Sequence, residues 1–335
     1  MSKLTVALLN YNGKKHLANF LPSVIAHSQP HDIVVIDNGS TDDSLVFLKN
    51  SFPEVKVLAF DKNHGFCGGY NKALALIEAE FVVLLNTDVE VTANWITPIL
   101  DLLESDAQIA AVQPKILDLK SKNHFEYAGA SGGFLDILGY PFCRGRIFHT
   151  IEEDQHQYQD ITDVFWASGS SLFVRKSAYF EAGGLDEDFF AHMEEIDLCW
   201  RFWNLGFKVQ VCPQSEVYHL GGGTLDKSSP RKTYLNFRNG LSIIFKNEEA
   251  TLLIWKLPFR IVLDWLAVFQ FSILSGRKHG LAILHAHLDF MLSISTQIRK
   301  RKKVIRNNSN NPRYQGFIIW DYFVLKKKIY RKVKT

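Results

Sequence analysis

The first 90 residues alternate between short apolar runs and clusters of polar and glycine residues. Four of the apolar runs have the length of a strand: 4–9, 33–36, 55–60 and 81–85. Three intervals between them have the apolar spacing of a helix: 14–27, 44–50 and 65–80. Strands of about five residues that alternate with helices predict an α/β fold, in which a mostly parallel sheet is covered by helices on both faces.

A polar cluster follows each of these predicted strands. The clusters are YNG at 11–13, DNGSTDDS at 37–44, DKNHGFCGGYNK at 61–72 and NTDVE at 86–90. Ligands of parallel sheets bind beyond the carboxyl ends of the strands, so the clusters predict a ligand site at that edge. The glycines form no GxGxxG fingerprint, and the GK[ST] of a P-loop is missing. A dinucleotide or ATP site of these two kinds is therefore disfavoured.

The charge of the chain is divided unevenly along its length. Residues 251–335 contain 17 Lys and Arg against three Asp, whereas residues 1–250 contain 21 Lys and Arg against 32 Asp and Glu. This split indicates that the two parts of the chain face different surroundings, and we expect a first domain at 1–245 followed by a helical, basic extension at 246–335. The four cysteines lack CxxC or zinc spacing, which favours reduced thiols, and the amino-terminal residues do not resemble a secretory signal. We therefore expect a cytoplasmic protein.

The run FVVLLNTDVE, residues 81–90, passes directly from apolar residues into two carboxylates. Asp88 with a neighbouring oxygen could hold Mg²⁺ or Mn²⁺, because these ions prefer carboxylate ligands and leave positions open for phosphate oxygens. In the simpler interpretation, Asp88 or Thr92 caps a helix that contains Trp95 and Leu100. His219 could add an imidazole ligand suited to Mn²⁺, although a single histidine is more often structural.

The segment HMEEIDLCWR, residues 192–201, places several charges on one predicted helix. Glu194, Asp197 and Arg201 share a face through their spacing of three and four residues. Aromatic residues on both sides indicate a largely buried neighbourhood. Carboxylates in such surroundings are candidates for a general base with a raised pKa, but structural ion pairs occupy similar helices.

Taken in order, the motifs resemble those of the family 2 glycosyltransferases, which have the GT-A fold and include bacterial rhamnosyltransferases. The resemblance covers about residues 4–245 and rests on LLNYNG, VVIDNGSTDDS, NHGFCGGYNKAL, FVVLLNTDVE, WASGSSLFVRKSAYFEAGGLDEDFF, HMEEIDLCWR and VYHLGG. It implies inverting transfer of a sugar from a nucleotide-diphosphate donor to an acceptor hydroxyl. The donor would be similar to dTDP-rhamnose or a UDP-sugar, and the acceptor a glycan or lipid-linked sugar in cell-surface polysaccharide assembly.

The resemblance also implies roles for individual residues. Asp88 would bind the metal, and His219 would be a further ligand because Asn86 stands where the family often has an Asp. Glu195 would be the general base, with Glu194 orienting the acceptor. Asp37 and Asn38 would lie by the base and ribose of the nucleotide. The complete predicted donor side consists of Asn10, Tyr11, Asn12, Asp37, Asn38, Asn63, Gly65, Phe66, Asn71, Asn86 and Thr87.

Residues 251–276 are apolar and aromatic but are interrupted by Lys256, Arg260 and Asp264. The uncharged run 265–276 has 12 residues, which is too short for a membrane span of about 20 residues. An interfacial helix is favoured, with tryptophans and the basic residues at headgroup depth, and RKRKK at 299–303 would attract anionic lipid. We expect peripheral association with the inner face of the cytoplasmic membrane. The alternatives are packing on the catalytic domain or a homodimer contact; nucleic-acid binding is disfavoured because no such motif is present.

Two other function classes are consistent with parts of the pattern. A nucleotidyltransferase could use a similar fold with Mg²⁺, but the amino terminus lacks a GxGxR-type motif. A non-catalytic binding module could keep the fold without the chemistry, and Asn86 in place of an acidic residue is consistent with that. The presence of Asp88, Glu194, Glu195 and His219 favours the enzyme.

Overall fold

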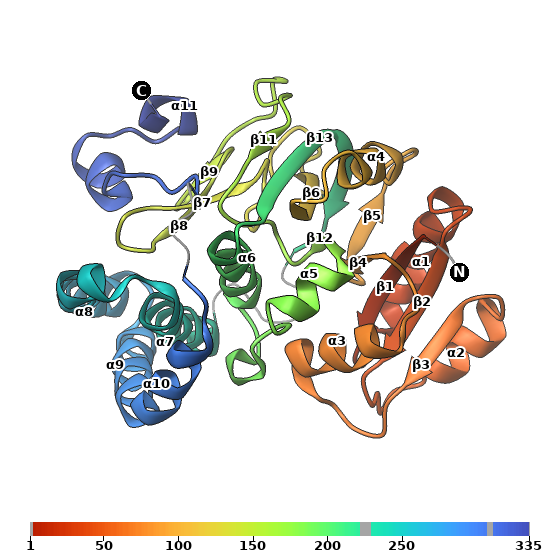
Figure 1. The fold of residues 1–335 in the computed structure, drawn as a ribbon, viewed down its shortest axis with the longest axis horizontal. Coiled ribbons are helices and arrows are strands. Elements are labelled where there is room, and N and C mark those ends of the chain that lie inside the picture. Colours follow the sequence, from red (N-terminus) through yellow and green to blue (C-terminus); the bar gives the residue numbers. More distant parts are fainter. Residues whose placement is uncertain (1–2, 222–228, 307–310, 335) are drawn as a thin grey trace.

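The computed structural model describes residues 3–221, 229–306 and 311–334 (Figure 1). An α/β part holds a large central sheet, and the helices of residues 230–303 gather beside it, at the lower left of Figure 1. The sheet order is β11-β13-β6-β12-β4-β1-β2-β3, with β5 paired to β13. A second, four-stranded sheet lies off this path. The predicted α/β fold is confirmed.

The first part of the chain forms the alternating units that the sequence predicts. Its elements are β1 (Leu4–Asn10), α1 (Lys14–His27), β2 (Asp32–Asp37), α2 (Ser44–Ser51), β3 (Lys56–Ala59), α3 (Gly65–Leu76) and β4 (Phe81–Leu85). The strands β4, β1, β2 and β3 are all parallel. Their carboxyl ends therefore lie at one edge of the sheet, where the polar clusters begin.

The second part of the chain makes the sheet mixed. Its main elements are β5 (Val89–Val91), α4 (Thr97–Ser105), β6 (Ile109–Asp118), β11 (Thr162–Asp163), β12 (Ser171–Arg175), α5 (Lys176–Glu181), the 3-10 turn η1 (Glu187–Phe189), α6 (Glu194–Leu205) and β13 (Lys208–His219). The small sheet consists of β7 (Gly133–Leu135), β8 (Pro141–Cys143), β9 (Arg146–Ile147) and β10 (Thr150–Ile151). Strand β12 is antiparallel to both β4 and β6, while β13 is parallel to β6.

The structure corrects the cap interpretation of Asp88 and several element bounds. Strand β5 follows Asp88 directly, and α4 begins only at Thr97, so neither Asp88 nor Thr92 caps it. Strand β13 continues to residue 219, where its end pairs with β5. Helix α3 ends at residue 76, and β12 begins only at residue 171.

Two hydrophobic clusters pack on opposite faces of the sheet. Alternate residues of β1 divide between them, because successive side chains of a strand point to opposite faces. Val6 belongs to the cluster that contains Trp95, and Ala7 to the cluster that contains Tyr70 and Trp200. The four cysteines are buried and free, in agreement with the predicted reduced thiols.

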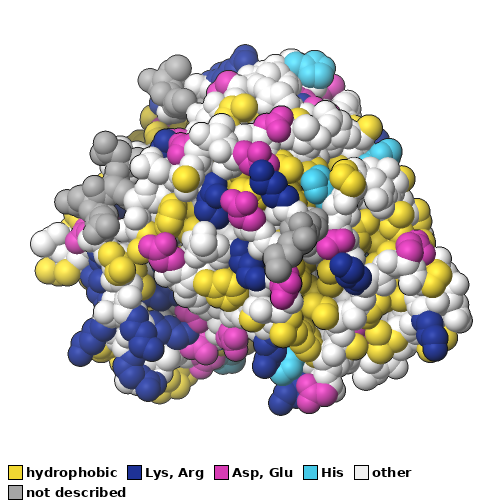
Figure 2. All heavy atoms as spheres, turned by 45° about the vertical axis from the view of Figure 1, so that its right-hand side comes forward, with side chains coloured by type: hydrophobic (Ala, Val, Ile, Leu, Met, Phe, Trp, Pro, Cys, Tyr) yellow, Lys and Arg dark blue, Asp and Glu magenta, His cyan; other side chains and the backbone are white. Residues whose placement is uncertain are grey.

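The C-terminal region is helical, as predicted. It comprises α7 (Pro230–Asn247), α8 (Ala250–Leu274), α9 (Arg277–Leu292), α10 (Ile294–Lys303), the π-helical turn η2 (Trp320–Val324) and α11 (Tyr330–Lys334). The predicted domain division at 245/246 falls near the end of α7. Lys and Arg side chains gather at the lower left of the face in Figure 2, below a centre of mixed charges.

Helix α8 differs from the sequence prediction in where its charges lie. Lys256 and Arg260 were expected at headgroup depth, but they are buried against the rest of the protein, with exposed fractions of 2% and 3%. The reason is pairing: Lys256 contacts Glu248 at 2.7 Å, and Arg260 contacts Asp264 at 2.9 Å. Within the described residues, no helix is both long and apolar enough to cross a membrane.

Candidate active site

The loops after β1 and β2 hold each other at the carboxyl edge of the sheet. Asn10 donates from Nδ2 to Asp37 Oδ2 at 3.0 Å, and the backbone N–H of Ser40 donates to the other carboxylate oxygen at 2.9 Å. Asn12 accepts from the Thr41 backbone at 2.7 Å. Asp37 is fully buried, so it supports the loops at this edge from the protein interior. Tyr11 is about half exposed and open to a ligand.

The loop before α3 is attached to the same edge through Asn38. The Asn38 amide donates to Asn63 Oδ1 at 3.0 Å and to the Gly65 carbonyl at 2.9 Å, while its oxygen accepts from the His64 backbone at 3.0 Å. Gly65 has a φ of 71°, a conformation that favours glycine. These contacts bring together the predicted donor-side residues of three successive loops.

Asn71 is the member of the predicted donor set that the structure does not place with the others. Its oxygen accepts from Tyr179 at 2.6 Å and from the Leu185 backbone at 2.9 Å. Its amide donates to the Leu185 carbonyl at 2.9 Å and to Glu187 at 3.1 Å. Asn71 therefore holds the 179–187 segment onto α3.

Asp88 and His219 meet because β5 pairs antiparallel with the end of β13. Val89 lies opposite His219 in that ladder, and the Leu220 backbone donates to the Asp88 carbonyl at 3.0 Å. His219 Nε2 consequently lies 3.2 Å from Asp88 Oδ1, and both side chains are buried. On the other side of the ring, Nδ1 lies 3.5 Å from Glu126 Oε1.

This environment determines the charge of the imidazole. Burial alone would lower the pKa of His219, but its interactions with the Asp88 and Glu126 carboxylates outweigh it and raise the pKa to about 10. Burial also opposes ionisation of Asp88, yet the hydrogen bond with His219 leaves the pKa of that carboxyl below its ordinary value. Without a metal, the pair is an ion pair.

The Asp88–His219 pair has a spacing that fits a divalent cation. Two neighbouring ligands of an octahedral ion at about 2.1 Å are about 3 Å apart, and the two atoms here are 3.2 Å apart. Glu126 Oε1 lies within ion-pair distance of Nδ1 without a hydrogen bond between them, and acidic neighbours of metal-bound histidines commonly orient the ring. Among the described residues no three His, Cys, Asp or Glu side chains converge as a complete metal site. The remaining positions would fall to phosphate oxygens and water.

Glu194 and Glu195 begin α6 after a stretch of unusual backbone. Phe190, His192 and Met193 have φ values of 62°, 67° and 74°, which residues other than glycine rarely adopt. Glu194 is buried, whereas Glu195 is partly exposed. One oxygen of each carboxylate is buried without a hydrogen-bond partner among the described residues. Such unpartnered atoms are where a ligand would be expected to bind.

The pKa values of this pair follow from the lack of partners. Burial raises the pKa of Glu195 to about 7, only partly offset by backbone hydrogen bonds. Burial, followed by the charge of Glu195, raises the pKa of Glu194 well above its ordinary value. A carboxyl with a strongly raised pKa beside one with a pKa of about 7 is a combination that suits an orienting donor beside a general base.

Asp197, three residues after Glu194, has a different role from its neighbours. It accepts from Arg201 at 2.9 and 2.7 Å and pairs with Lys246 at 2.8 Å. Burial opposes its ionisation, but the charges of Arg201 and Lys246 lower the pKa of this carboxyl below its ordinary value. The structural interpretation of the shared helix face is therefore correct for Asp197 and Arg201.

Helix α7 holds the strained stretch before α6. The fully buried amide of Asn239 donates to the carbonyls of Phe189, Ala191 and His192 at 3.2, 3.0 and 2.7 Å. One side chain on α7 thus satisfies three backbone oxygens just ahead of Glu194. This contact determines where the two glutamates stand.

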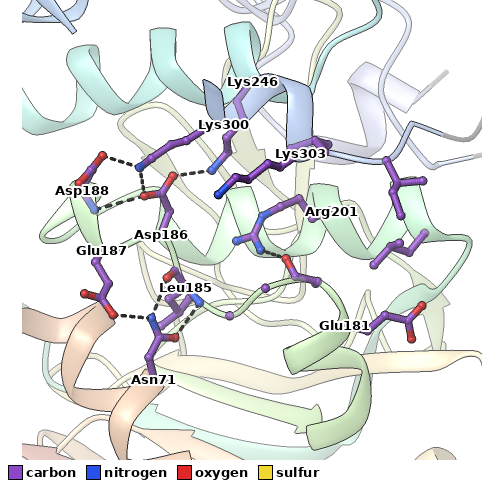
Figure 3. Close-up of a pocket in the computed structure, with 16 residues that line it drawn as sticks. Asn71, Glu181, Leu185, Asp186, Glu187, Asp188, Arg201, Lys246, Lys300 and Lys303 are labelled. Atoms are coloured by element: carbon purple, nitrogen blue, oxygen red, sulfur yellow. Dashed lines mark hydrogen bonds and ion pairs between the residues drawn. The ribbon is translucent and has the colours of Figure 1, made fainter. Parts of the chain in front are cut away.

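The C-terminal helices also hold η1 by ion pairs (Figure 3). Lys246 contacts Asp186 at 2.7 Å, and Lys300 of α10 contacts both Asp186 and Asp188. These groups border a cavity of about 490 Å³ that Arg201 and Lys303 also line. Asn71 of the predicted donor set lines this cavity, but neither Asp88 nor Glu195 does, so the cavity is separate from the Asp88–His219 pair and from the glutamates of α6.

Gly169 connects the donor side to the glutamates. A Cβ added there would meet Glu195 Cβ at 3.7 Å and the Phe66 ring at 3.8 Å. The neighbouring Ser170 carbonyl accepts from the Asn86 backbone at 2.9 Å, and Thr87 precedes Asp88. The 168–170 segment therefore joins the NTDVE motif, Phe66 and the start of α6 into one site.

Sequence reasoning missed Glu126, Gly169 and Asn239. Glu126 lies in an irregular segment without a local signal, and Asn239 resembles an ordinary polar residue of a helix. Gly169 lies in the WASGSS motif, which could have identified it. All three act through contacts between segments far apart in the chain.

Sequence comparison relates the chain to known glycosyltransferases. Residues 5–166 match the family model described as Glycosyl transferase family 2. Over 235 residues the chain is 29% identical to an N-acetylglucosaminyl-diphospho-decaprenol L-rhamnosyltransferase of Mycobacterium tuberculosis, and the match covers 64% of this chain and 75% of that protein.

Solved structures resemble the fold at low sequence identity. S. aureus TarS in complex with UDP gives a TM-score of 0.57 at 16% identity, covering 88% of this chain and 82% of that one. GalNAc-T7 with UDP, GalNAc and Mn²⁺ gives a TM-score of 0.57 at 16% identity, covering 91% of this chain and 58% of that one. These structures have the GT-A fold, which this chain shares, and residues 5–166 carry the sequence pattern of the family 2 glycosyltransferases.

Proposed function

We propose that the protein transfers a sugar, with inversion, from a nucleotide-diphosphate donor to a hydroxyl of a glycan or lipid-linked acceptor in cell-surface polysaccharide assembly. The donor is a dTDP-rhamnose-like sugar nucleotide or a UDP-sugar. The observation that carries the proposal is the pair formed by Asp88 and His219 at 3.2 Å, at the sheet edge to which the 168–170 segment also brings the unpartnered carboxylate of Glu195. The rhamnosyltransferase relative supports the donor class.

The donor binds along the carboxyl edge of the sheet. Asp37 and Asn38 lie beneath the base and ribose and keep the loops in shape. Tyr11 and Phe66 offer aromatic surface, because Tyr11 is exposed and Phe66 lies next to Gly169. Asn71 is left out of this set, since its amide is fully used by the 179–187 segment.

Asp88 and His219 hold Mg²⁺ or Mn²⁺ in this proposal. The bound ion stabilises negative charge on the leaving diphosphate. Glu126 orients the ring of His219 from the Nδ1 side. Asn86 contributes its backbone to the Ser170 contact, so its side chain is free to face the donor.

Glu195 takes the proton of the acceptor hydroxyl during its attack on the anomeric carbon. A carboxylate with a pKa of about 7 is ionised in about half of the molecules at neutral pH and is a stronger base than an ordinary glutamate. Burial raises the pKa of Glu194, and in its protonated form this carboxyl donates a hydrogen bond that orients the acceptor or Glu195. A single displacement of this kind inverts the configuration and needs no covalent sugar–enzyme intermediate.

A peripheral position on the inner face of the cytoplasmic membrane suits this activity. The acceptor named for the mycobacterial relative carries a decaprenol chain, and such a chain stays in the bilayer. An enzyme at the membrane surface would meet acceptor and soluble donor together.

The test is calorimetric titration of UDP and dTDP into the purified protein, with and without Mn²⁺. We expect metal-dependent binding of one nucleotide, reduced at least about tenfold by Asp88→Ala, because a lost metal ligand typically costs that much. Glu90→Ala is the matched control: Glu90 lies two residues away and pairs with Lys122 at 2.8 Å on the surface. If nucleotide binding is unaffected by Mn²⁺ and by Asp88→Ala, the proposed metal site is wrong. If neither nucleotide binds, the proposed donor class is wrong.

A further inference from the structure

In helix α8 the charged side faces the protein and the apolar side faces outward, which is the reverse of an ordinary surface helix. Lys256, Arg260 and Asp264 recur every four residues and are 2%, 3% and 0% exposed. They face the protein, where Arg260 donates to the Leu138 carbonyl at 3.1 Å and Asp264 accepts from Tyr140 at 3.0 Å. In a soluble amphipathic helix this side would be apolar and the other side charged.

The opposite side of α8 is an apolar stripe open to the surroundings. Its members follow the spacing of one helix face, and their exposed fractions rise along the helix from 40% to 82%. The stripe consists of Trp255, Phe259, Val262, Leu266, Phe269 and Ile273. Exposed apolar surface of this extent marks a contact with a protein or a membrane.

The stripe continues onto the C-terminal segment and is accompanied by a second helix. The rings of Phe259 and Phe317 are 6.3 Å apart, and beyond Phe317 the segment exposes Trp320, Val324 and Leu325. Helix α9, which packs on α8, exposes Leu281, Leu284, Leu288, Met291 and Leu292. We call the α8 stripe together with residues 317–325 the apolar face.

Basic residues border the apolar face. Arg277 and Lys278 are exposed directly after the end of α8, and Lys326 and Lys328 are exposed directly after Leu325. The acidic residues nearby do not balance them: Asp264 and Asp321 are buried and paired. The border of the face is therefore positive.

We propose that the apolar face docks onto an anionic lipid bilayer, with α8 lying in the plane of the membrane and the bordering Lys and Arg at the phosphates. The proposal deepens the proposed function, on which it rests for the lipid-linked acceptor. A bilayer fits better than a second copy of the chain, because two copies meeting at this face would bring basic borders together, whereas anionic headgroups complement them. The tryptophans suit the interface depth.

The docking face is rigidly related to the catalytic side of the molecule. Helix α7, which packs on α8, holds the backbone ahead of Glu194 through Asn239, and α10, which packs on α7, contacts Asp186 and Asp188 through Lys300. A bilayer held at the apolar face thus has a fixed position relative to Glu195. An acceptor anchored in that bilayer would present its hydroxyl at a defined height.

The test is sedimentation of the full chain with vesicles of phosphatidylcholine alone or mixed with phosphatidylglycerol. The wild type is expected to bind the anionic vesicles more tightly than the neutral ones. The double variant Leu266→Glu/Phe269→Glu should lower the partition coefficient at least about tenfold, because two apolar side chains leave the interface. The matched control is Val46→Glu/Leu76→Glu, at catalytic-domain positions that are 61% and 62% exposed, and it should change partitioning less than about twofold.

A second measurement separates this proposal from the proposed function. Both double variants should keep the nucleotide affinity of the wild type in solution, because neither touches the donor loops. Equal vesicle binding by wild type and the α8 variant would overturn the docking face even if nucleotide binding is intact. A wild-type dimer in sedimentation velocity that the α8 variant dissociates, without vesicle binding, would overturn it in favour of a second copy.

Discussion

The carboxylates that begin α6 and the carboxylate of Asp264 in α8 differ in their charged partners. Asp264 contacts Arg260 at 2.9 Å and accepts from Tyr140 at 3.0 Å. Among the described residues, Glu194 and Glu195 have no cation beside them, although one oxygen of each of the three carboxylates lacks a hydrogen-bond partner. A buried charge with partners is part of the structure, whereas one without them costs stability and indicates a function.

The same difference appears within α6 itself. Burial raises the pKa of Glu194 and Glu195, but at Asp197 the nearby Arg201 and Lys246 reverse the effect of burial and lower the pKa. Three carboxylates within four residues therefore divide into two whose pKa is raised and one that is held in ion pairs. The division is set by Arg201, four residues further along α6, together with Lys246 from α7.

The largest expected effect is the loss of activity when Glu195 is replaced. Glu195→Gln keeps the size of the side chain but removes the base, and we expect kcat to fall about 10³-fold. Nucleotide affinity should remain within about twofold, because Glu195 faces the acceptor. Steady-state assays with donor and acceptor, together with calorimetry, measure both. If kcat falls less than about tenfold, another group is the base.

On the structural side, Asp264→Ala should destabilise the fold by about 3 kcal/mol, because it leaves Arg260 buried without its partner. The double variant Arg260→Met/Asp264→Leu should recover most of that loss, since neither charge then remains. Urea denaturation of the three proteins measures the differences. A double variant as unstable as Asp264→Ala would mean that the hydrogen bonds to Leu138 and Tyr140, rather than the ion pair, stabilise this contact.

The fold and part of the site could be read from the sequence because both depend on local patterns. Short apolar runs between helical segments are enough for a parallel sheet, and polar clusters at strand ends are enough to place a ligand edge. Glu126 and Asn239 could not be found this way, because their partners lie in segments that only the folded chain brings near. The sequence also could not show that the charged face of α8 is buried. Spacing shows that Lys256, Arg260 and Asp264 share a face, but not which face of the helix packs against the protein.

A smaller effect is expected at the contact that joins the two regions. Asn239→Ala leaves three carbonyls without their donor and should destabilise the protein by about 2 kcal/mol. It should also lower kcat several-fold without changing nucleotide affinity, because the backbone before Glu194 loses its support. Ser242→Ala is the matched control, since Ser242 is buried on the same helix but bonds only to the Arg238 carbonyl of its own helix. A loss of stability with unchanged kcat would make Asn239 purely structural.

The smallest expected effect is a gain in stability when the charge of Glu195 is removed. The pKa of Glu195 is raised to about 7 in the folded protein from an ordinary 4.5, so the folded state holds its proton more tightly than the unfolded state does. The stabilisation that the protonated Glu195 carboxyl provides is complete below about pH 4.5 and is lost as the pH rises through about 7. Since Glu195 is partly exposed, Glu195→Gln should stabilise the protein by only about 1 kcal/mol at pH 8.

Thermal unfolding of wild type and Glu195→Gln at pH 5 and pH 8 measures this gain. The difference should be close to zero at pH 5, where the wild-type carboxyl is protonated in the folded state, and should reach its full value at pH 8. Glu90→Gln, at the surface ion pair with Lys122, should show no such gain at pH 8, because its carboxylate has a partner. A difference between wild type and Glu195→Gln that is equal at both pH values would mean that packing, not the unpartnered charge, separates the two proteins. The contrast between reactive and structural carboxylates would then have to rest on kcat alone.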